Sequence, residues 1–324
     1  MQSCSHPAVG TELLFPAFDY ISGETFQVAR CRECAQVVTL PVPADLGRYY
    51  PVGYYGDKQG RRFPAAIEWL QEKLYAWRAG QVLRRLKQEN ARVLDVGCGR
   101  GLLLRAFQRN GCDVTGTEFS DGACRFAREV LKLPVRVGVL QELKFPDHSF
   151  DVVVMWHVLE HVSDPRPTLA EVSRILRPGG LFLVAVPNFG SPEAQLSKAG
   201  WFHLDVPRHL SHHTHASLSQ ILGEAGLTPR WVSSLAPEYD TFSFVQSLLN
   251  WLGVRPNLLY NWLRGQGAKV IGGKRPAGSI IVTGLLAPVL GVVSLPATFL
   301  LAFLGLGATL TTTAVKKSPP ATGK

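Results

Sequence analysis

Three glycines at alternate positions, Gly97, Gly99 and Gly101, follow a short apolar run that contains the acid Asp95. Glycine lets the backbone turn with positive φ and approach a ligand closely. A second acid, Glu118, stands about 20 residues past this loop, where an acid that hydrogen-bonds ribose hydroxyls is expected. The residue types and their spacing therefore predict a site for a ligand that carries a ribose.

A strand, a tight turn and a helix are the elements that must position these residues. Residues 92–96 suit a buried strand, and a helical pattern of leucines begins at Leu102. Together they form the nucleotide-binding half of a doubly wound sheet. A dinucleotide fold would carry Gly-x-Gly-x-x-Gly, whereas here the third glycine comes two residues after the second.

The combination Asp-x-Gly-x-Gly-x-Gly with a later acid resembles the class I S-adenosylmethionine-dependent methyltransferases. The resemblance covers residues 92–235 and implies an α/β fold, with a Rossmann-like, doubly wound sheet of seven strands whose last strand is antiparallel. It implies S-adenosylmethionine as the cofactor, with the ligands Asp95, Gly97, Gly99, Gly101, Glu118, Phe119, Leu140 and Gln141. Many relatives carry an acid where this chain has Val139, so Gln141 or the Leu140 backbone would make the adenine contact. The alternative is an α/β domain with an empty glycine turn.

A continuous apolar run, residues 152–156, ends in His157-Val158-Leu159-Glu160-His161. Such a run suits a strand buried on both faces, and its carboxyl end faces the ligand crevice of an open α/β sheet. The segment 145–165 resembles the small-molecule, ubiquinone-biosynthesis branch of the family, in which a Glu-His pair is associated with a divalent metal. Glu160 and His161 match that pair, and the alternative is that they cap and orient a helix.

A long connection, residues 188–215, holds five of the nine histidines. Connections of this length in a compact domain are usually functional, and part of this one resembles a motif of methyltransferases from glycan and lipid gene clusters. We expect His209 and His157 as candidate bases for a hydroxyl acceptor, because imidazole titrates near neutral pH. Asp205 and Arg208 are candidates to position the substrate. The alternatives are loop packing and a histidine metal cluster.

Cysteines near the amino terminus form a candidate zinc knuckle. Cys31 and Cys34 make a Cys-x-x-Cys pair, and Cys4 with His6 would complete a tetrahedral ligand set. The alternative is a reduced, metal-free knuckle that packs as a small lid. A Tyr-rich stretch, residues 49–55, follows as a candidate loop over cofactor or substrate. No charged-then-apolar signal sequence opens the chain, so we expect a reducing, cytoplasmic setting.

Charge and apolar sequence are distributed unevenly. The formal net charge is +9, no Asp or Glu follows Asp240, and eight basic residues do. In this part, residues 276–315 carry no charge, and residues 280–304 are apolar over a length that suffices for a bilayer, about 20 residues. Positive charge that brackets apolar sequence favours an anionic membrane surface over nucleic acid as a partner.

Two prolines, Pro288 and Pro296, interrupt this apolar segment. A single membrane crossing would also leave residues 306–316, the expected last strand, on the far side. We therefore expect two short helices in a hairpin that dips into one leaflet. The alternatives are a transmembrane anchor, with residues 309–315 outside the sheet, and a buried hairpin at a dimer interface.

Five parts follow along the chain: a cysteine-pair and Tyr-rich leader at 1–60, amphipathic helices at 61–91, the methyltransferase core at 92–235, the apolar insertion at 236–305, and the last strand with a polar tail at 306–324. They predict a methyltransferase on the cytoplasmic side of a membrane that acts on a small-molecule or lipid- or glycan-linked acceptor, at oxygen. The competing hypothesis is a non-catalytic cofactor-binding or interaction protein with a degenerate acceptor site.

Overall fold

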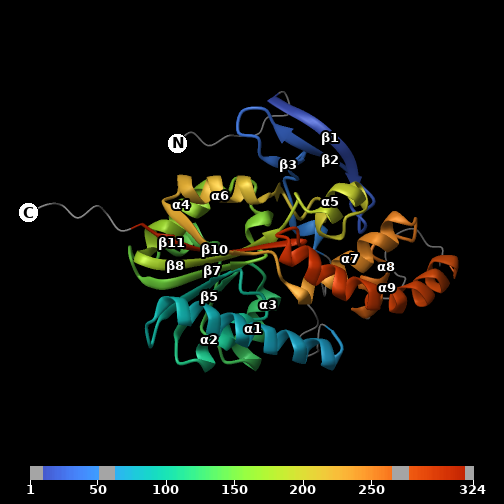
Figure 1. Cartoon of the computed structure of the whole chain (residues 1–324). Coiled ribbons are helices and arrows are strands. Elements are labelled where there is room, and N and C mark those ends of the chain that lie inside the picture. Colours follow the sequence, from blue (N-terminus) through green and yellow to red (C-terminus); the bar gives the residue numbers. More distant parts are fainter. Residues whose placement is uncertain (1–9, 51–62, 265–276, 318–324) are drawn as a thin grey trace, which may run out of the picture.

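The computed structural model describes residues 10–50, 63–264 and 277–317. Cys4 and His6 of the candidate zinc set lie outside the described residues. The described chain forms a central sheet with helices on both faces, a second sheet beside it, and a helical unit that projects from one end (Figure 1).

Seven strands form the central sheet, in the spatial order β10, β11, β8, β7, β4, β5, β6. Their bounds are β4 (Arg92–Val96), β5 (Asp113–Glu118), β6 (Val135–Val137), β7 (Phe150–Trp156), β8 (Leu176–Pro187), β10 (Leu227–Ser233) and β11 (Thr309–Lys316). Strand β11 runs antiparallel to both of its neighbours, β8 and β10. The other neighbouring pairs are parallel. This arrangement confirms the expected seven-stranded sheet and its late, antiparallel last strand.

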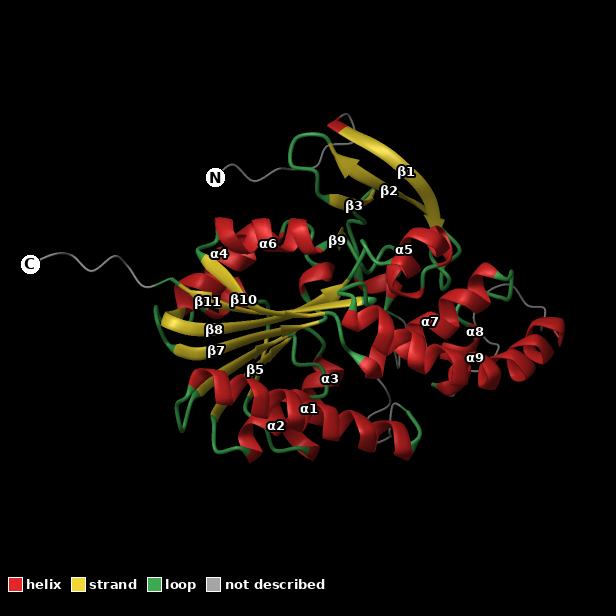
Figure 2. Cartoon of the chain, viewed as in Figure 1, coloured by secondary structure: helices red, strands yellow, loops and turns green. Residues whose placement is uncertain are grey.

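Helices cover both faces of this sheet (Figures 1 and 2). On one face lie α1 (Ala65–Leu86), α2 (Leu102–Arg109) and α3 (Asp121–Arg125), and on the other lie α4 (Pro165–Ile175) and α6 (His215–Glu224). Apolar side chains of the strands point alternately to the two faces, and each face has its own buried cluster, around Phe107 and around Phe182. Buried parallel strands read as continuous apolar runs for this reason.

The second sheet joins the amino-terminal segment to the long histidine-rich connection. Its strands are β1 (Thr11–Phe18), β2 (Thr25–Cys31), β3 (Val37–Leu40) and β9 (Ser211–His212). Strand β9 belongs to the connection, so residues about 170 positions apart become neighbours, as in the bond from the Thr39 hydroxyl to the His209 carbonyl. The short helix α5 (Pro192–Ser197) lies in the same connection. The leader is therefore part of the wall around the ligand crevice.

The insertion before β11 forms the helical unit, which consists of α7 (Pro237–Trp251), α8 (Leu258–Leu263) and α9 (Ala277–Phe303). The expected pair of short helices is wrong, because α9 is one helix that contains both Pro288 and Pro296. Its residues Leu286, Ala287 and Leu290 pack on a buried cluster of α7 and α8. This packing on either side of Pro288 keeps the helix continuous where the proline removes a backbone hydrogen bond.

Candidate functional site

The glycine turn lies between β4 and α2, at the carboxyl ends of the parallel strands. Gly97, Gly99 and Gly101 all have positive φ, of 65°, 54° and 77°. A Cβ atom at Gly97 would lie 2.7 Å from a methyl group of Val158, whereas a Cβ at Gly99 would meet nothing within 4 Å. The turn is thus packed on one side and open on the other, as a ligand-binding turn must be.

Two acids flank this open side. Glu118 is buried, and its carboxylate accepts hydrogen bonds of 2.8 Å from the backbone N–H groups of Gly99 and Ser120. Burial raises its pKa, and the bonds from Ser120 and Gly99 act in the opposite direction. Burial, together with the charge of Glu118, raises the pKa of Asp95 to about 8. The predicted Asp95 and Glu118 therefore face one small region, with Glu118 holding the open glycine in place.

The predicted adenine contacts lie in different settings. Phe119 is exposed beside Glu118, and Leu140 is buried at the start of a short turn after β6. The side chain of Gln141 is exposed, and its amide donates to the Thr168 hydroxyl of α4 at 2.9 Å. Gln141 is therefore turned toward α4 in this structure, and an adenine contact through the Leu140 backbone stays a prediction.

His157 follows β7 directly and has a positive φ of 54°, a conformation that is uncommon for a residue with a side chain. Its Nδ1 lies 3.1 Å from Oε1 of Glu160, and its Nε2 is buried without a hydrogen-bond partner among the described residues. Burial alone would raise the pKa of Glu160, but the bond to His157 and the charges of His157, His209 and His161 together bring this pKa to about 2. An ionised, fully buried carboxylate therefore orients the imidazole of His157.

Glu160, His161 and His209 come together, with candidate ligand atoms that all lie within 4.8 Å of one another. Oε2 of Glu160 is buried without a hydrogen-bond partner among the described residues. Nδ1 of His161 lies 2.9 Å from the Arg208 carbonyl, and Nδ1 of His209 lies 2.7 Å from the His203 carbonyl. A metal-binding histidine usually donates its second ring N–H in this way. These residues fit a divalent cation better than the Glu-His pair alone suggests.

The two predicted substrate residues differ in their surroundings. The guanidinium of Arg208 is fully buried and pairs with Asp19 at 2.7 Å and with Asp205 at 2.8 Å. It joins the amino-terminal sheet to the histidine-rich connection, which is a structural position and leaves it no acceptor-facing surface. Asp205 is partly exposed and lines a cavity. Burial raises the pKa of Asp205, but Arg208 and the neighbouring histidines lower it, and the result is a pKa of about 2.

Four of the five histidines of the connection, His203, His209, His212 and His213, are buried. Burial lowers the pKa of His209 to about 4 and that of His203 to about 3. His212 contacts the Thr39 hydroxyl through Nε2 at 2.9 Å, and His213 contacts the Ser211 hydroxyl at 3.1 Å. These contacts match the expectation of loop packing for both.

The Cys-x-x-Cys pair stands at the turn between β2 and β3. Cys31 is buried and Cys34 is partly exposed. The carbonyl of Gly10 accepts a hydrogen bond of 2.9 Å from the Arg32 N–H, so the chain enters β1 beside this turn. Cys4 and His6 precede that point by a few residues, and the zinc set stays a prediction.

Two tyrosines lie near the histidines, and only Tyr50 belongs to a stretch that the sequence singles out. The ring of Tyr239, on α7, lies 4.4 Å from the ring of His157, and its hydroxyl bonds to that of Tyr75 at 2.9 Å. The hydroxyl of Tyr50 lies 3.2 Å from Nδ1 of His161. The Tyr-rich stretch signals Tyr50, but no local pattern indicates that the first turn of α7 reaches His157.

A family model described as a methyltransferase domain matches residues 68–230. The ubiquinone biosynthesis O-methyltransferase of Rhizobium etli is 31% identical over 194 residues, which are 58% of this chain and 75% of the relative. That of Maricaulis maris is 34% identical over 155 residues, 44% of this chain and 61% of the relative. This chain thus spans less than two thirds of the Maricaulis enzyme.

Among solved structures, the geranyl diphosphate C-methyltransferase of Streptomyces coelicolor, in complex with Mg²⁺, geranyl diphosphate and S-adenosyl-L-homocysteine, is similar at 16% identity. The match covers 85% of this chain and 89% of that one, with a TM-score of 0.47. The family model, the Rhizobium relative and the order of the seven strands agree with the glycine turn and its acids. The chain belongs to the class I S-adenosylmethionine-dependent methyltransferases, in the branch of the ubiquinone-biosynthesis enzymes, and S-adenosylmethionine is its cofactor.

Proposed function

We propose that this protein transfers the methyl group of S-adenosylmethionine to a hydroxyl oxygen of a small molecule at the cytoplasmic surface of a membrane. The observation that carries the proposal is the His157–Glu160 pair, with 3.1 Å between Nδ1 and Oε1. An imidazole whose Nδ1 is held by a buried carboxylate presents Nε2 as a base of fixed orientation. A hydroxyl acceptor needs such a base, because it must lose its proton as it is methylated.

In the proposed reaction, the acceptor oxygen attacks the methyl carbon of the sulfonium. A C–O bond forms, the C–S bond breaks with its electron pair left on sulfur, and the hydroxyl proton passes to Nε2 of His157. The products are the methyl ether and S-adenosylhomocysteine. The protein contributes alignment of the two reactants and removal of this proton.

His157 is a better candidate base than His209. The residue after His157, Val158, lies against the glycine turn, within 2.7 Å of where a Cβ at Gly97 would be. His209 instead lies in the cluster with Glu160 and His161, where its Nδ1 faces the His203 carbonyl. A divalent cation held by Glu160, His161 and His209 would add positive charge that favours an ionised acceptor oxygen.

The relatives support oxygen as the methylated atom, since both are named as O-methyltransferases of ubiquinone biosynthesis. Replacing His157 by Asn should slow a single turnover with labelled S-adenosylmethionine by about 10²–10⁴-fold, the range of one general base. Binding of the cofactor should stay unchanged. Equal turnover by the variant would contradict the assignment of the base.

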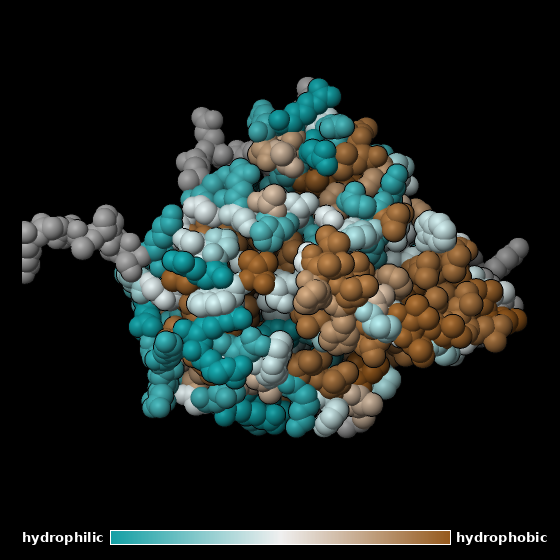
Figure 3. Space-filling view, in the orientation of Figure 1, coloured by the Kyte–Doolittle hydropathy of each residue, from teal (hydrophilic) through white to brown (hydrophobic). Residues whose placement is uncertain are grey.

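The membrane part of the proposal is based on α9, which buries polar residues and exposes apolar ones, the reverse of the usual arrangement. Its polar residues Thr283, Ser294 and Thr298 are buried, whereas most of its large apolar residues are exposed, Val292 by 77%. The segment Gly278–Phe303 has a mean hydropathy of 2.2, and only 11% of its most apolar stretch is buried inside the protein. Figure 3 shows the hydrophobic side chains gathered over the helical unit, beside a largely hydrophilic surface over the sheet and its helices. A large exposed apolar surface of this kind marks an interaction site.

One leaflet is the setting that this geometry favours. Helix α9 is long enough to cross a bilayer, but β11 begins six residues after its last residue, Phe303, and is paired on both sides within the sheet. The middle of α9 also packs on α7 and α8, which a crossing would carry into the membrane. A helix that lies in the interface avoids both difficulties. Arg255 and Arg264, which belong to this unit, would meet anionic headgroups.

Sedimentation with vesicles tests the membrane part. The intact protein should bind vesicles of phosphatidylglycerol more strongly than vesicles of phosphatidylcholine. Val292→Asp should weaken binding to both kinds of vesicle, because a charge on the apolar face opposes burial in lipid. Leu196→Asp is the matched control, since Leu196 is also 77% exposed but lies on α5. Equal binding by the two variants would exclude α9 as the contact.

A further inference from the structure

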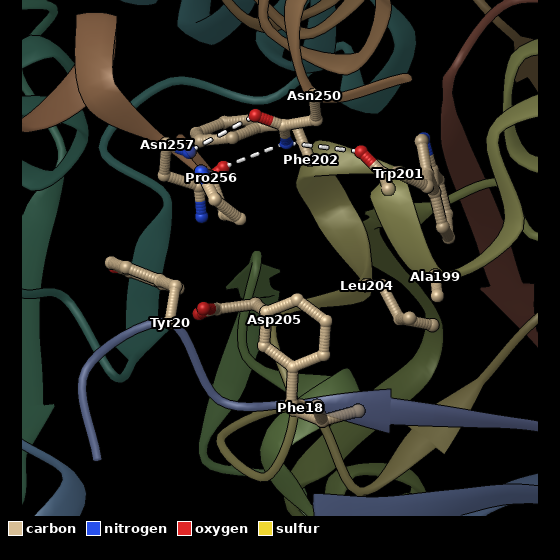
Figure 4. A pocket seen from close by; sticks show the side chains of 12 residues that line it. Phe18, Tyr20, Ala199, Trp201, Phe202, Leu204, Asp205, Asn250, Pro256 and Asn257 are labelled. Atoms are coloured by element: carbon tan, nitrogen blue, oxygen red, sulfur yellow. Dashed lines mark hydrogen bonds between the residues drawn. The ribbon is translucent and has the colours of Figure 1, made fainter. Parts of the chain in front are cut away.

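A cavity of about 180 Å³ lies where the amino-terminal sheet, the turn at residues 201–206 and the end of α7 meet. In Figure 4, Tyr20, Asp205 and Phe18 lie on one side of it, and Asn250, Pro256 and Asn257 lie on the other. The volume equals that of about six water molecules in the liquid. It has room for one small head group.

We propose that this cavity binds a neutral, hydroxyl-bearing head group of a membrane amphiphile, as the outer part of the acceptor site. The inference depends on the proposed methyl transfer at a membrane surface for its role. The binding itself is a separate property that can be measured without turnover.

The polar groups of the cavity suit hydroxyls. Oδ1 of Asp205 accepts from Nε and Nη2 of Arg208, at 3.0 and 2.8 Å, and Oδ2 lies 4.0 Å from Nε2 of His209. The second oxygen can therefore accept from a ligand. Oδ1 of Asn257 accepts from the Asn250 amide at 3.0 Å, which leaves Nδ2 of Asn257 as a donor. A hydroxyl both donates and accepts, so two neighbouring hydroxyls can satisfy both groups.

The hydroxyl of Tyr20 adds a third polar group that stays neutral, because burial and the charge of Asp205 raise its pKa. Phe18 and Phe202 supply aromatic walls, and Phe202 is fixed by Phe242 and Tyr260, each at a ring distance of 5.2 Å. Flat apolar walls beside a donor and an acceptor are suited to the C–H and O–H groups of a polyol.

Charge decides against an anionic head group. Asp205 is ionised, and its counter-charge, Arg208, is completely buried behind it and shared with Asp19. A phosphate in the cavity would face the Asp205 carboxylate. Arg264 is near enough to lower the pKa of Tyr20, so an anion held at the rim by Arg264 is the competing outcome.

An apolar chain attached to the head group could contact exposed apolar residues next to the cavity. Asn250, in the cavity wall, is followed by the exposed Trp251 and Leu252 of the helical unit, and Phe18 at the rim is 54% exposed. The cavity therefore has exposed apolar side chains next to its wall, on the helical unit that we propose to meet lipid. An amphiphile can keep its chain in that surface while its head group enters the cavity.

The cavity also adjoins the proposed reaction site. Its wall at Phe202 and Leu204 flanks His203, whose ring stacks on that of His157 at 6.2 Å. Asp205 reaches His209 from the other end of the same turn. A ligand in the cavity would thus be separated from His157 by the thickness of one turn of chain.

Saturation-transfer NMR on the full chain tests the inference with octyl β-glucoside below its micellar concentration. Methyl β-glucoside serves as the head group without a chain, and octyl phosphate as the anionic counterpart. We expect saturable binding of octyl glucoside, weaker binding of methyl glucoside, and the weakest binding of octyl phosphate. Asn257→Ala and Phe18→Ala should each weaken the binding of octyl glucoside about five- to tenfold, as expected for one lost polar or aromatic contact.

Leu13→Ala is the matched control, because Leu13 lies on the same strand as Phe18, is 64% exposed and does not line the cavity. Unchanged affinity in Asn257→Ala and Phe18→Ala would show an adventitious additive only, and tighter binding of octyl phosphate would replace the proposed ligand by an anion. Either result overturns the inference, as does the absence of octyl glucoside binding. Binding of S-adenosylmethionine is measured on the same samples, so a failure of the methyltransferase proposal is recognised separately.

Discussion

The donor half and the acceptor half of the site are built in different ways. The donor half consists of Asp95, the glycine turn and Glu118, which lie within 24 positions of chain and on adjacent parallel strands. The acceptor half collects Tyr20 and Tyr50 from the leader, His157 from the end of β7, His203 to His209 from the long connection, and Tyr239 from α7. A binding site for a common cofactor is thus local, whereas the site for the individual acceptor depends on tertiary structure.

This difference explains what holds each half together. Backbone conformation and one buried carboxylate fix the donor half. Buried ion pairs between distant segments fix the acceptor half, chiefly Asp19–Arg208–Asp205. We therefore expect substitutions in the two halves to separate into effects on cofactor binding and effects on assembly of the acceptor wall.

The largest effect should follow the loss of Arg208. Arg208→Met leaves the carboxylates of Asp19 and Asp205 without their shared partner, and the cost of such a buried unpaired charge is about 3–5 kcal/mol of the free energy of unfolding. Urea unfolding measures it. Arg125→Met, which removes an exposed pair with Asp121, is the control and should leave stability nearly unchanged. A similar small effect for both variants would mean that Arg208 does not hold the two segments together.

A smaller effect should separate two glycines of the same turn. Gly97→Ala brings a Cβ within 2.7 Å of Val158 at a positive φ, so we expect a loss of about 2–4 kcal/mol in the free energy of unfolding. Gly99→Ala meets open space and should cost only the conformational part, about 1–2 kcal/mol. Both substitutions should weaken the binding of S-adenosylmethionine. Equal losses of stability would show that Gly97 is not packed as described.

The smallest effect is a pH dependence that sharpens the contrast between buried acids and buried histidines. Burial raises the pKa of Asp95 and of Asp240 to about 8, and that of Glu193 to about 7. Each group binds more protons folded than unfolded between about pH 4 and these values, so stability falls as the pH rises through this window. The buried histidines have lowered pKa values and act in the opposite direction, but their contribution is nearly complete above about pH 7.5, where unfolded imidazoles are neutral too.

Urea unfolding of the ligand-free protein should therefore show a lower free energy of unfolding at pH 8.0 than at pH 6.5. The expected slope is on the order of 1 kcal/mol per pH unit for each titrating acid. Asp240→Asn should flatten this slope. A stability that rises over the same interval would mean that these carboxyl groups are ionised in the folded protein.

Local patterns in the sequence were sufficient for the donor half and for the central sheet. The apolar run of β7, the glycine spacing and the late strand at Thr309 all act over a few residues, and the structure places these elements as expected. Tyr239 and Tyr20 could not be found in this way, since their places depend on how α7 and β1 pack. Pro288 and Pro296 were misleading about α9, because contacts with α7 and α8 outweigh the hydrogen bond lost at a proline.

The central claim is that the open side of the glycine turn holds S-adenosylmethionine. Calorimetric titration of the intact protein and of Gly99→Ala tests it most directly, because this substitution fills the open side without meeting any protein atom within 4 Å. The account predicts one bound cofactor per chain, and binding at least about tenfold weaker in the variant, which corresponds to about 1.4 kcal/mol. The same affinity in both proteins, or no heat with the intact protein, would contradict it.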